Sequence, residues 1–146
     1  MDEKLKARIL LVDDEEDFLK TLSDRLEIRG LKVNTASSGE DAVSMAEQQE
    51  FDAIILDLSM PGIDGIETLE RIKAISPSAE IIMLTGHGSI DSGIKAMKTG
   101  AGDFLQKPVE MKTLLEKIGE AKNRRMLVLE KNSREELDQI LKSRGW

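Results

Sequence analysis

The chain of 146 residues contains no cysteine, so disulfide bonds, thiolate metal sites and thiol nucleophiles are excluded. It also lacks any apolar run near the roughly 20 residues that a membrane-spanning helix needs. Its first residues, Met-Asp-Glu-Lys-Leu-Lys, do not form the apolar core of a signal peptide. These absences predict a cytoplasmic protein that makes no contact with a membrane.

Positive charge is in short supply, with 21 basic residues against 28 acidic ones and a formal net charge of −7. Such a balance opposes non-specific attraction to nucleic acid. We therefore expect no direct nucleic acid binding by this chain. With 40% hydrophobic residues, the length suits one compact domain and leaves little for a second.

What the sequence does contain is a strict alternation of short strand-like runs, most of them apolar, and helix-like stretches. The runs, interpreted as strands, are Arg8–Val12, Lys32–Ala36, Ala53–Asp57, Glu80–Thr85 and Asp103–Gln106. The stretches between them, interpreted as helices, are Glu16–Arg29, Gly39–Gln49, Gly65–Ile75, Ile90–Thr99 and Met111 onward. This alternation predicts an α/β fold in which helices cover both faces of a doubly wound parallel sheet.

Four of the predicted strands end on residues that can bind a charged group. These residues are Asp13 with Asp14, Asp57, Thr85 and Lys107. In open parallel sheets the ligand site lies outside the carboxyl ends of the strands. We therefore expect three carboxylates, one hydroxyl and one ammonium to share a cleft suited to a divalent cation and a phosphoryl group.

The adjacent carboxylates of Asp13 and Asp14 would repel each other unless a cation shares their site. Mg²⁺ prefers oxygen ligands and is usually held by one or two carboxylates together with waters and a phosphate. Asp14 and Asp57 are the expected direct ligands, and Asp13 is expected to hold a metal-bound water. Asp57 can also attack phosphorus to form an aspartyl phosphate. Lys107 would neutralise the transferring oxygens, and the Thr85 hydroxyl would hydrogen-bond one of them.

These residues stand in motifs that resemble the receiver domains of two-component response regulators, the CheY-like superfamily. The motifs are Val-Asp-Asp at 12–14, Leu-Asp-Leu-Ser-Met-Pro-Gly-Ile-Asp-Gly at 56–65, Leu-Thr-Gly at 84–86 and Gly-Ala-Gly-Asp-Phe-Leu-Gln-Lys-Pro at 100–108. The resemblance implies a flavodoxin-like (βα)5 fold with strand order 2-1-3-4-5. It also implies phosphotransfer to Asp57 from the phosphohistidine of a sensor histidine kinase.

The resemblance further implies roles for individual residues. Mg²⁺ would be held by Asp14, Asp57 and the backbone carbonyl of Ser59, with Asp13 acting through water. Thr85 and Phe104 would move together on phosphorylation, and the Lys107-Pro108 peptide bond would be cis. Phe104 cannot donate a hydrogen bond as a tyrosine could, so its inward state would depend on packing alone.

Two positions implied by the resemblance face the phosphoryl group and tune its hydrolysis. They are Ser59, two residues after Asp57, and His87, two residues after Thr85. A polar pair there leaves the lifetime of the phosphorylated state open. His87, the single histidine, sits between glycines, and a solvated loop residue is the simpler interpretation.

Residues 1–122 are predicted to form the receiver, and residues 123–146 a helical extension or a linker toward an output domain. An intermittent apolar stripe along that extension fits a dimeric coiled coil, a signalling helix or a helix that folds back. The basic residues Lys122, Arg124 and Arg125 interrupt the stripe, and we interpret them as a solvated helical face rather than a nucleic acid patch. The motifs after Thr85 look most like receivers that precede an ATPase in σ54-dependent transcriptional activators.

The favoured hypothesis is a receiver whose phosphorylation at Asp57 switches partner binding or dimerisation, in transcriptional control. Dimerisation would use the C-terminal helix or the face formed by the fourth helix, fifth strand and fifth helix. The chain would not be an enzyme beyond self-phosphorylation and slow autodephosphorylation. Alternatives are a stand-alone receiver that docks on a partner protein, an aspartyl-phosphate hydrolase and a constitutive scaffold.

Overall fold

The computed structural model describes residues 6–58, 64–86 and 90–145. Its elements are β1 (Arg8–Val12), α1 (Glu16–Ile28), β2 (Lys32–Ala36), α2 (Gly39–Gln48), β3 (Ala53–Asp57), α3 (Gly65–Ile75), β4 (Ile81–Thr85), α4 (Ile90–Thr99), β5 (Asp103–Gln106) and α5 (Met111–Ser143). The predicted alternation is confirmed. Helices α1 and α2 each end one residue earlier than predicted because Arg29 and Gln49 serve as their C-caps, and β4 begins at Ile81.

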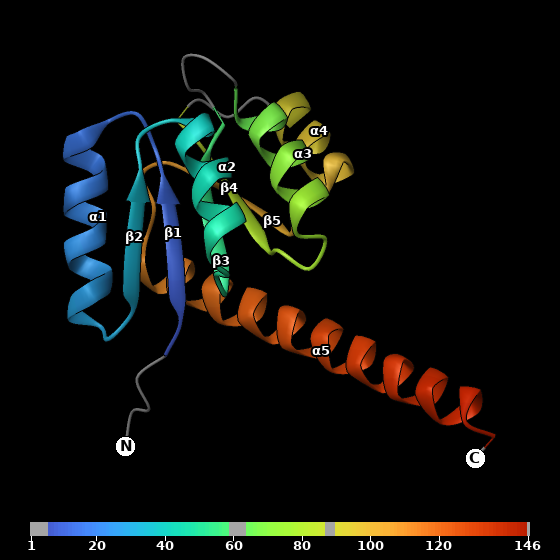
Figure 1. Cartoon of the computed structure of the whole chain (residues 1–146). Coiled ribbons are helices and arrows are strands. Elements are labelled where there is room, and N and C mark those ends of the chain that lie inside the picture. Colours follow the sequence, from blue (N-terminus) through green and yellow to red (C-terminus); the bar gives the residue numbers. More distant parts are fainter. Residues whose placement is uncertain (1–5, 59–63, 87–89, 146) are drawn as a thin grey trace.

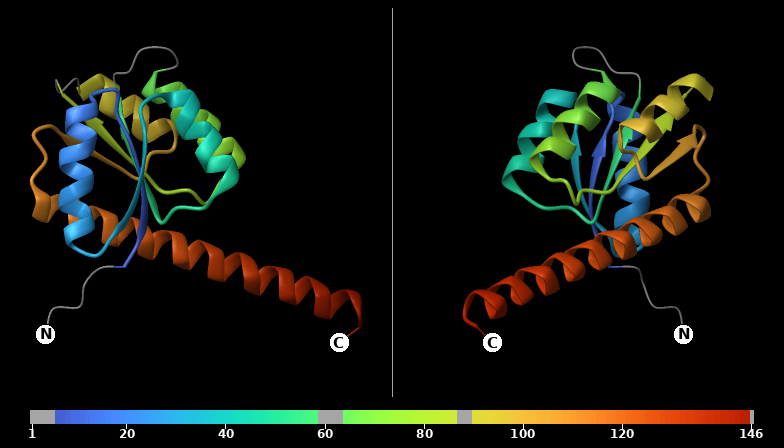
Figure 2. Two further views of the ribbon diagram at one scale, coloured as in Figure 1. Left: turned by 60° about the vertical axis from the view of Figure 1, so that its left-hand side comes forward. Right: turned by 90° about the vertical axis from the view of Figure 1, so that its right-hand side faces the viewer.

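All five strands are parallel and follow the order β2-β1-β3-β4-β5, as the sequence predicts (Figure 1). Helices α1 and α5 cover one face of the sheet, and α2, α3 and α4 cover the other (Figure 2). The central strands β3 and β4 are buried at every position. Burial on both faces explains why their sequences are uninterrupted apolar runs rather than alternating patterns.

Each face of the sheet has its own apolar core. On the α1 and α5 face, Ile55 of β3 packs with Leu26 and Ile118. On the opposite face, Leu56 of the same strand packs with Leu69 of α3. Alternate residues of a strand point to opposite faces, so each strand contributes to both cores. Packing on both faces therefore fixes the register of the sheet. The strand ends that carry the polar residues are thereby fixed relative to one another.

Helix α5 runs without a break from Met111 to Ser143, through the predicted domain boundary at residues 122–123. Its first turns pack on the sheet, and the rest extends away from the domain (Figures 1 and 2). Most side chains beyond Arg125 are exposed, and Leu127 is 66% exposed. The helix therefore does not fold back onto the receiver. In the described part of the chain, no helix is both long and apolar enough to cross a membrane.

The prediction of a solvated basic face on this helix is wrong for Arg125. Its exposure is only 8%, and its guanidinium lies against acidic residues of the domain. The neighbouring Arg124 also forms an ion pair with the domain, through Glu80. Helical spacing alone could not reveal these contacts, because the acidic partners lie 44 residues or more earlier in the sequence.

Candidate metal and phosphoryl site

The polar residues predicted to converge all lie at the carboxyl ends of neighbouring strands. Asp13 follows β1 and Asp57 ends β3, and these strands pair through Val12 and Leu56. Thr85 ends β4, where Asp57 pairs with Leu84. The backbone N–H of Lys107 donates to the Thr85 carbonyl at 2.7 Å, which ties the end of β5 to the same edge.

Three carboxylates gather at this edge. Asp13, Asp14 and Asp57 each offer one oxygen, and these oxygens all lie within 4.8 Å of one another. Asp13 and Asp57 are 1% and 4% exposed, whereas Asp14 is exposed. Opposite ligand oxygens of an octahedral Mg²⁺ lie about 4.2 Å apart. The donor set and its spacing therefore fit a hard divalent cation, and Asp13, Asp14 and Asp57 are the side chains that would hold it.

Lys107 supplies the positive charge of the cleft. Its Nζ lies 2.7 Å from Asp13 Oδ2, 3.8 Å from Glu15 Oε1 and 4.0 Å from Asp57 Oδ1. Burial works to lower the pKa of Lys107, but the hydrogen bond to Asp13 and the charge of Asp57 outweigh it, so the pKa is raised above 10.5. The ammonium thus stays protonated beside the predicted phosphoacceptor.

The predicted switch residues Thr85 and Phe104 lie on adjacent strands. Thr85 is 4% exposed and pairs in the sheet with Gln106 of β5, which lies two residues after Phe104. Phe104 is partly buried and packs against the core on the α2, α3 and α4 face. Its ring lies directly against Gly93 of α4. Phe104 pairs with Met83, two residues before Thr85, so it lies between the later part of β4 and helix α4.

Two further predictions concern the Lys107-Pro108 peptide bond and the residues Ser59 and His87. The Lys107-Pro108 peptide bond is cis in the structure. Ser59 and His87 lie outside the described residues, so the predicted metal contact of the Ser59 carbonyl and the predicted tuning of hydrolysis by both side chains stay predictions.

Sequence reasoning missed three residues that shape this site. The Phe18 ring centroid lies 4.3 Å from Lys107 Nζ, a cation–π contact that holds the ammonium from the α1 side. Glu15 adds a third carboxylate near the same ammonium, beside Asp13 and Asp57. A Cβ on Gly65 would lie 2.7 Å from the Asp57 carbonyl oxygen, so only glycine lets α3 begin this close to the end of β3.

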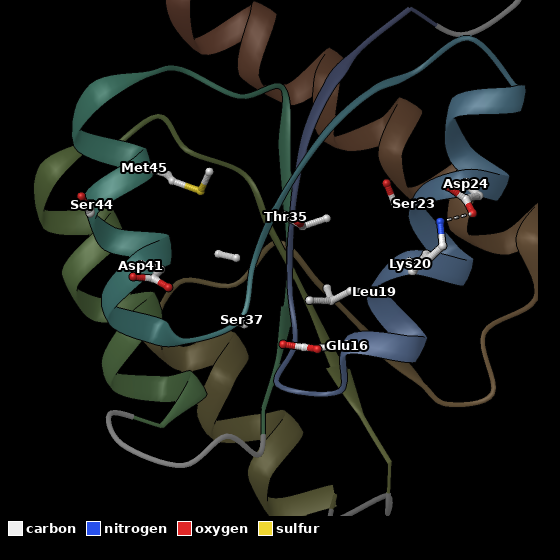
Figure 3. A pocket seen from close by; sticks show the side chains of 11 residues that line it. Glu16, Leu19, Lys20, Ser23, Asp24, Thr35, Ser37, Asp41, Ser44 and Met45 are labelled. Atoms are coloured by element: carbon white, nitrogen blue, oxygen red, sulfur yellow. Dashed lines mark hydrogen bonds and ion pairs between the residues drawn. The ribbon is translucent and has the colours of Figure 1, made fainter.

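A separate groove lies on the open side of the edge strand β2, between α1 and α2 (Figure 3). Its volume is about 670 Å³, and its lining includes Leu19, Thr35 and Met45. An ion pair between Lys20 and Asp24, 3.4 Å apart, lies on the α1 side of the groove (Figure 3). None of the three clustered carboxylates lines it, so the groove is distinct from the acidic site.

Comparison with known proteins agrees with this geometry. A family model described as the response regulator receiver domain matches residues 9–119. The C4-dicarboxylate transport transcriptional regulatory protein DctD of Rhizobium meliloti (strain 1021) is 33% identical over 125 residues. The transcriptional regulatory protein GlrR of Escherichia coli (strain K12) is 37% identical over 115 residues. These matches cover 86% and 79% of this chain but only 27% and 26% of the two regulators.

Solved structures give the same answer. A response regulator receiver domain protein from Clostridium thermocellum superposes with a TM-score of 0.80 at 40% identity, covering 84% of this chain and 98% of that one. NtrX from Brucella abortus superposes with a TM-score of 0.81 at 29% identity, covering 88% of this chain and 30% of that one. With the family model matching most of its length, the chain belongs to the response regulator receiver domain family of two-component signal transduction.

Proposed function

We propose that this chain is a phosphorylation-dependent switch in which Asp57 is the phosphoacceptor. The observation that carries the proposal is the charge arrangement around Asp57, a buried carboxylate with two further carboxylates within 4.8 Å and the Lys107 ammonium at 4.0 Å. Receiver domains bind Mg²⁺ and interact with histidine kinases, so membership in the family supports the same proposal.

In the proposed reaction, an oxygen of the Asp57 carboxylate attacks the phosphorus of a phosphohistidine. An acyl P–O bond forms, the P–N bond breaks, and the imidazole leaves and takes its proton from solvent. Asp14 and Asp57 would hold Mg²⁺ directly, with Asp13 acting through water. When bound, the ion supplies charge neutralisation to the phosphoryl oxygens. Lys107 would neutralise a further oxygen from its position between Asp13 and Asp57.

The switch would then act through Thr85 and Phe104. Once a phosphoryl oxygen is present, the Thr85 hydroxyl would donate a hydrogen bond to it and move toward Asp57. The space vacated at the end of β4 would be filled by the Phe104 ring, which has no hydroxyl and therefore moves for packing reasons alone. The ring contacts α4 at Gly93, so its movement would change the face formed by α4, β5 and α5.

We propose that the output is a change in dimerisation or partner binding in transcriptional control. The relatives named above are transcriptional regulators nearly four times as long as the matched segment. Two surfaces carry exposed apolar residues that could pair with a second copy. One is α4, with Ile94 and Met97, and the other is the projecting part of α5, with Leu137 and Ile140. A stand-alone receiver that docks on another protein is the alternative output.

The acceptor role is tested by incubating the chain with acetyl phosphate and Mg²⁺ and measuring its intact mass. We expect the mass of one phosphoryl group to be added to the wild type and to the control variant Asp138→Asn, and none to Asp57→Asn or in the presence of EDTA. Equal labelling of Asp57→Asn would contradict the proposal. Free phosphate is expected to appear slowly, because a receiver phosphorylates itself and does not turn over many substrate molecules. Rapid release of many phosphates per chain would instead indicate a hydrolase.

The output is tested by light scattering with and without beryllofluoride and Mg²⁺. A shift from monomer to dimer supports a dimerising receiver. An unchanged mass, together with Mg²⁺-dependent beryllofluoride binding, supports docking on a different protein.

A further inference from the structure

The apolar anchorage of α5 ends well before the helix does. Leu114, Ile118 and Ala121 are fully buried against the core beneath α1. From Met126 onward, most side chains are exposed. One turn of helix between these two parts carries three basic residues, Lys122, Arg124 and Arg125. This turn decides how firmly the projecting part of α5 is attached to the receiver.

All three basic residues reach the edge of the sheet opposite Asp57, where the strands begin. Arg124 Nε lies 3.2 Å from Glu80 Oε2, just before β4. The Arg125 guanidinium lies 3.2 Å from Glu50 and 3.9 Å from Asp52, just before β3. Lys122 Nζ donates to the Lys6 carbonyl, just before β1. The helix is therefore held at the starts of three different strands.

Two of the three acidic partners, Asp52 and Glu80, are held at the sheet, whereas Glu50, the nearer partner of Arg125, is 81% exposed. Asp52 Oδ2 accepts a hydrogen bond from the backbone N–H of Arg8 at 2.8 Å, and the Asp52 N–H donates to the Arg8 carbonyl at 2.8 Å. Glu80 is only 16% exposed, and the Arg125 side chain is 10% exposed. Surface ion pairs between two mobile side chains contribute little. Asp52 and Glu80 are ordered before pairing, so their contacts with Arg125 and Arg124 restrain the helix, whereas the pair with the exposed Glu50 adds little.

Gly102, which lies just before β5, leaves the space that the Arg124 contact occupies. A Cβ on Gly102 would lie 2.6 Å from Glu80 Oε2 and 2.9 Å from Arg124 Nη2. Both atoms are at the ends of flexible side chains, so they can move aside without disturbing the sheet. An alanine at this position would therefore displace the ion pair while leaving the backbone in place.

We propose that Arg124 and Arg125 form an ionic clamp that fixes the direction in which α5 leaves the receiver. Ion pairs from successive residues reach different strands, so the clamp restrains rotation about the helix as well as bending away from the sheet. When two receivers change how they pair, the part of α5 beyond Arg125 would then reorient together with its receiver, because the helix cannot bend or rotate freely where it leaves the domain. The clamp lies at the opposite edge from Asp57, so its effect on the direction of α5 does not depend on the phosphotransfer proposal, whereas the transmission of a change in pairing rests on the dimerisation proposed above.

The test is a distance measurement by double electron–electron resonance in the unphosphorylated chain. Because the chain has no cysteine, spin labels attach only to introduced ones, at the exposed positions Glu70→Cys on α3 and Gln139→Cys on α5. We expect a narrow distance distribution with the clamp intact. In the double variant Arg124→Gln with Arg125→Gln, the distribution is expected to broaden and shift. Gly102→Ala is expected to broaden it as well.

Matched controls separate the clamp from general effects on the helix. Arg134→Gln removes an exposed arginine whose partner, Glu130, lies on the same helix. Gly119→Ala adds a methyl group where nothing lies within 4 Å. Neither control is expected to change the distribution. The charge exchange Glu80→Arg with Arg124→Glu is expected to restore a narrower distribution than Arg124→Glu alone.

An unchanged distribution in the double arginine variant overturns the proposal. So does equal broadening in Arg134→Gln accompanied by loss of helical circular dichroism, because that result means fraying of the projecting helix. If the double variant fails to fold, Gly102→Ala decides alone, since its clash involves only side-chain ends. A narrow distribution in a folded Gly102→Ala variant, with no change from wild type, then overturns the Arg124 contact.

Discussion

Gly93 of α4 lies against the ring of Phe104, so that a Cβ at position 93 would lie 3.0 Å from Phe104 Cζ. The Phe104 ring occupies the space that the side chain of any residue other than glycine would need at position 93. Phe104 belongs to β5, so this contact sets how far the strand and α4 can approach each other. The proposed switch therefore depends on the lack of a side chain at Gly93 as well as on Thr85 and Phe104.

Gly93→Ala is expected to push the Phe104 ring by a few tenths of an ångström. The cost of overpacking and the gain in helix propensity are each about 1 kcal/mol, so we expect little net change in the free energy of unfolding. Fluorine NMR of fluorophenylalanine-labelled protein detects the displacement of the ring, since the chain has only three phenylalanines to assign. We expect the Phe104 resonance to shift or split and those of Phe18 and Phe51 to stay. A spectrum like that of Gly119→Ala would contradict this account.

Gly65→Ala is expected to be more damaging. Its Cβ would lie 2.7 Å from both the Asp57 carbonyl oxygen and Leu58 Cα, and backbone atoms cannot swing aside as side-chain ends can. We expect a loss of about 2–3 kcal/mol in the free energy of unfolding, measured by urea titration. Mg²⁺ binding, followed by calorimetry, should weaken because the end of β3 moves. Unchanged stability and affinity would show that α3 shifts instead.

The fold was predictable because burial on both faces makes β1, β3 and β4 nearly uninterrupted apolar runs. Strands β2 and β5 were predicted from their places in the alternation with helices. Asp13, Asp57, Thr85 and Lys107 could be assigned to one cleft because carboxyl ends of parallel strands share an edge. The strand order followed from the family resemblance to receivers, and the topology confirms it. Assigning the four residues to one cleft needs only the position of each residue relative to its own strand.

What the sequence could not predict are contacts between elements that lie far apart in the chain. Gly65, Gly93 and Gly102 read as turn or helix residues, and nothing local shows which atoms would meet a Cβ there. Arg124 and Arg125 looked like a solvated helical face because their acidic partners precede β3 and β4. Such pairings depend on the angle at which α5 crosses the sheet, which is a property of the assembled core.

Asp14→Asn is expected to separate metal binding from folding. Asp14 is the exposed member of the carboxylate cluster, so the metal-free variant should be at least as stable as the wild type because repulsion is relieved. Mg²⁺ affinity is expected to fall about tenfold, which corresponds to ~1.4 kcal/mol. Thermal melts with and without Mg²⁺ should show a smaller increase in melting temperature than in the wild type. Asp138→Asn is the control, and an equal increase in both variants would exclude Asp14 as a ligand.

The ion pair of Lys117 with Asp103 is expected to make the free energy of unfolding depend on pH in the alkaline range. Lys117 Nζ lies 3.1 Å from Asp103 Oδ2 and 3.4 Å from Glu120 Oε2. The hydrogen bond to Asp103, followed by the charges of Asp103 and Glu120, raises the pKa of Lys117 above 10.5. A raised lysine pKa means that the stabilisation is fully present below pH 10.5 and is lost as the pH rises through the folded-state pKa.

We expect the difference in urea midpoint between the wild type and Lys117→Gln to be constant from neutral pH to about 10 and to shrink above it. Lys131→Gln on the projecting helix should show no such difference, and a decline that begins near neutral pH would mean that another group titrates.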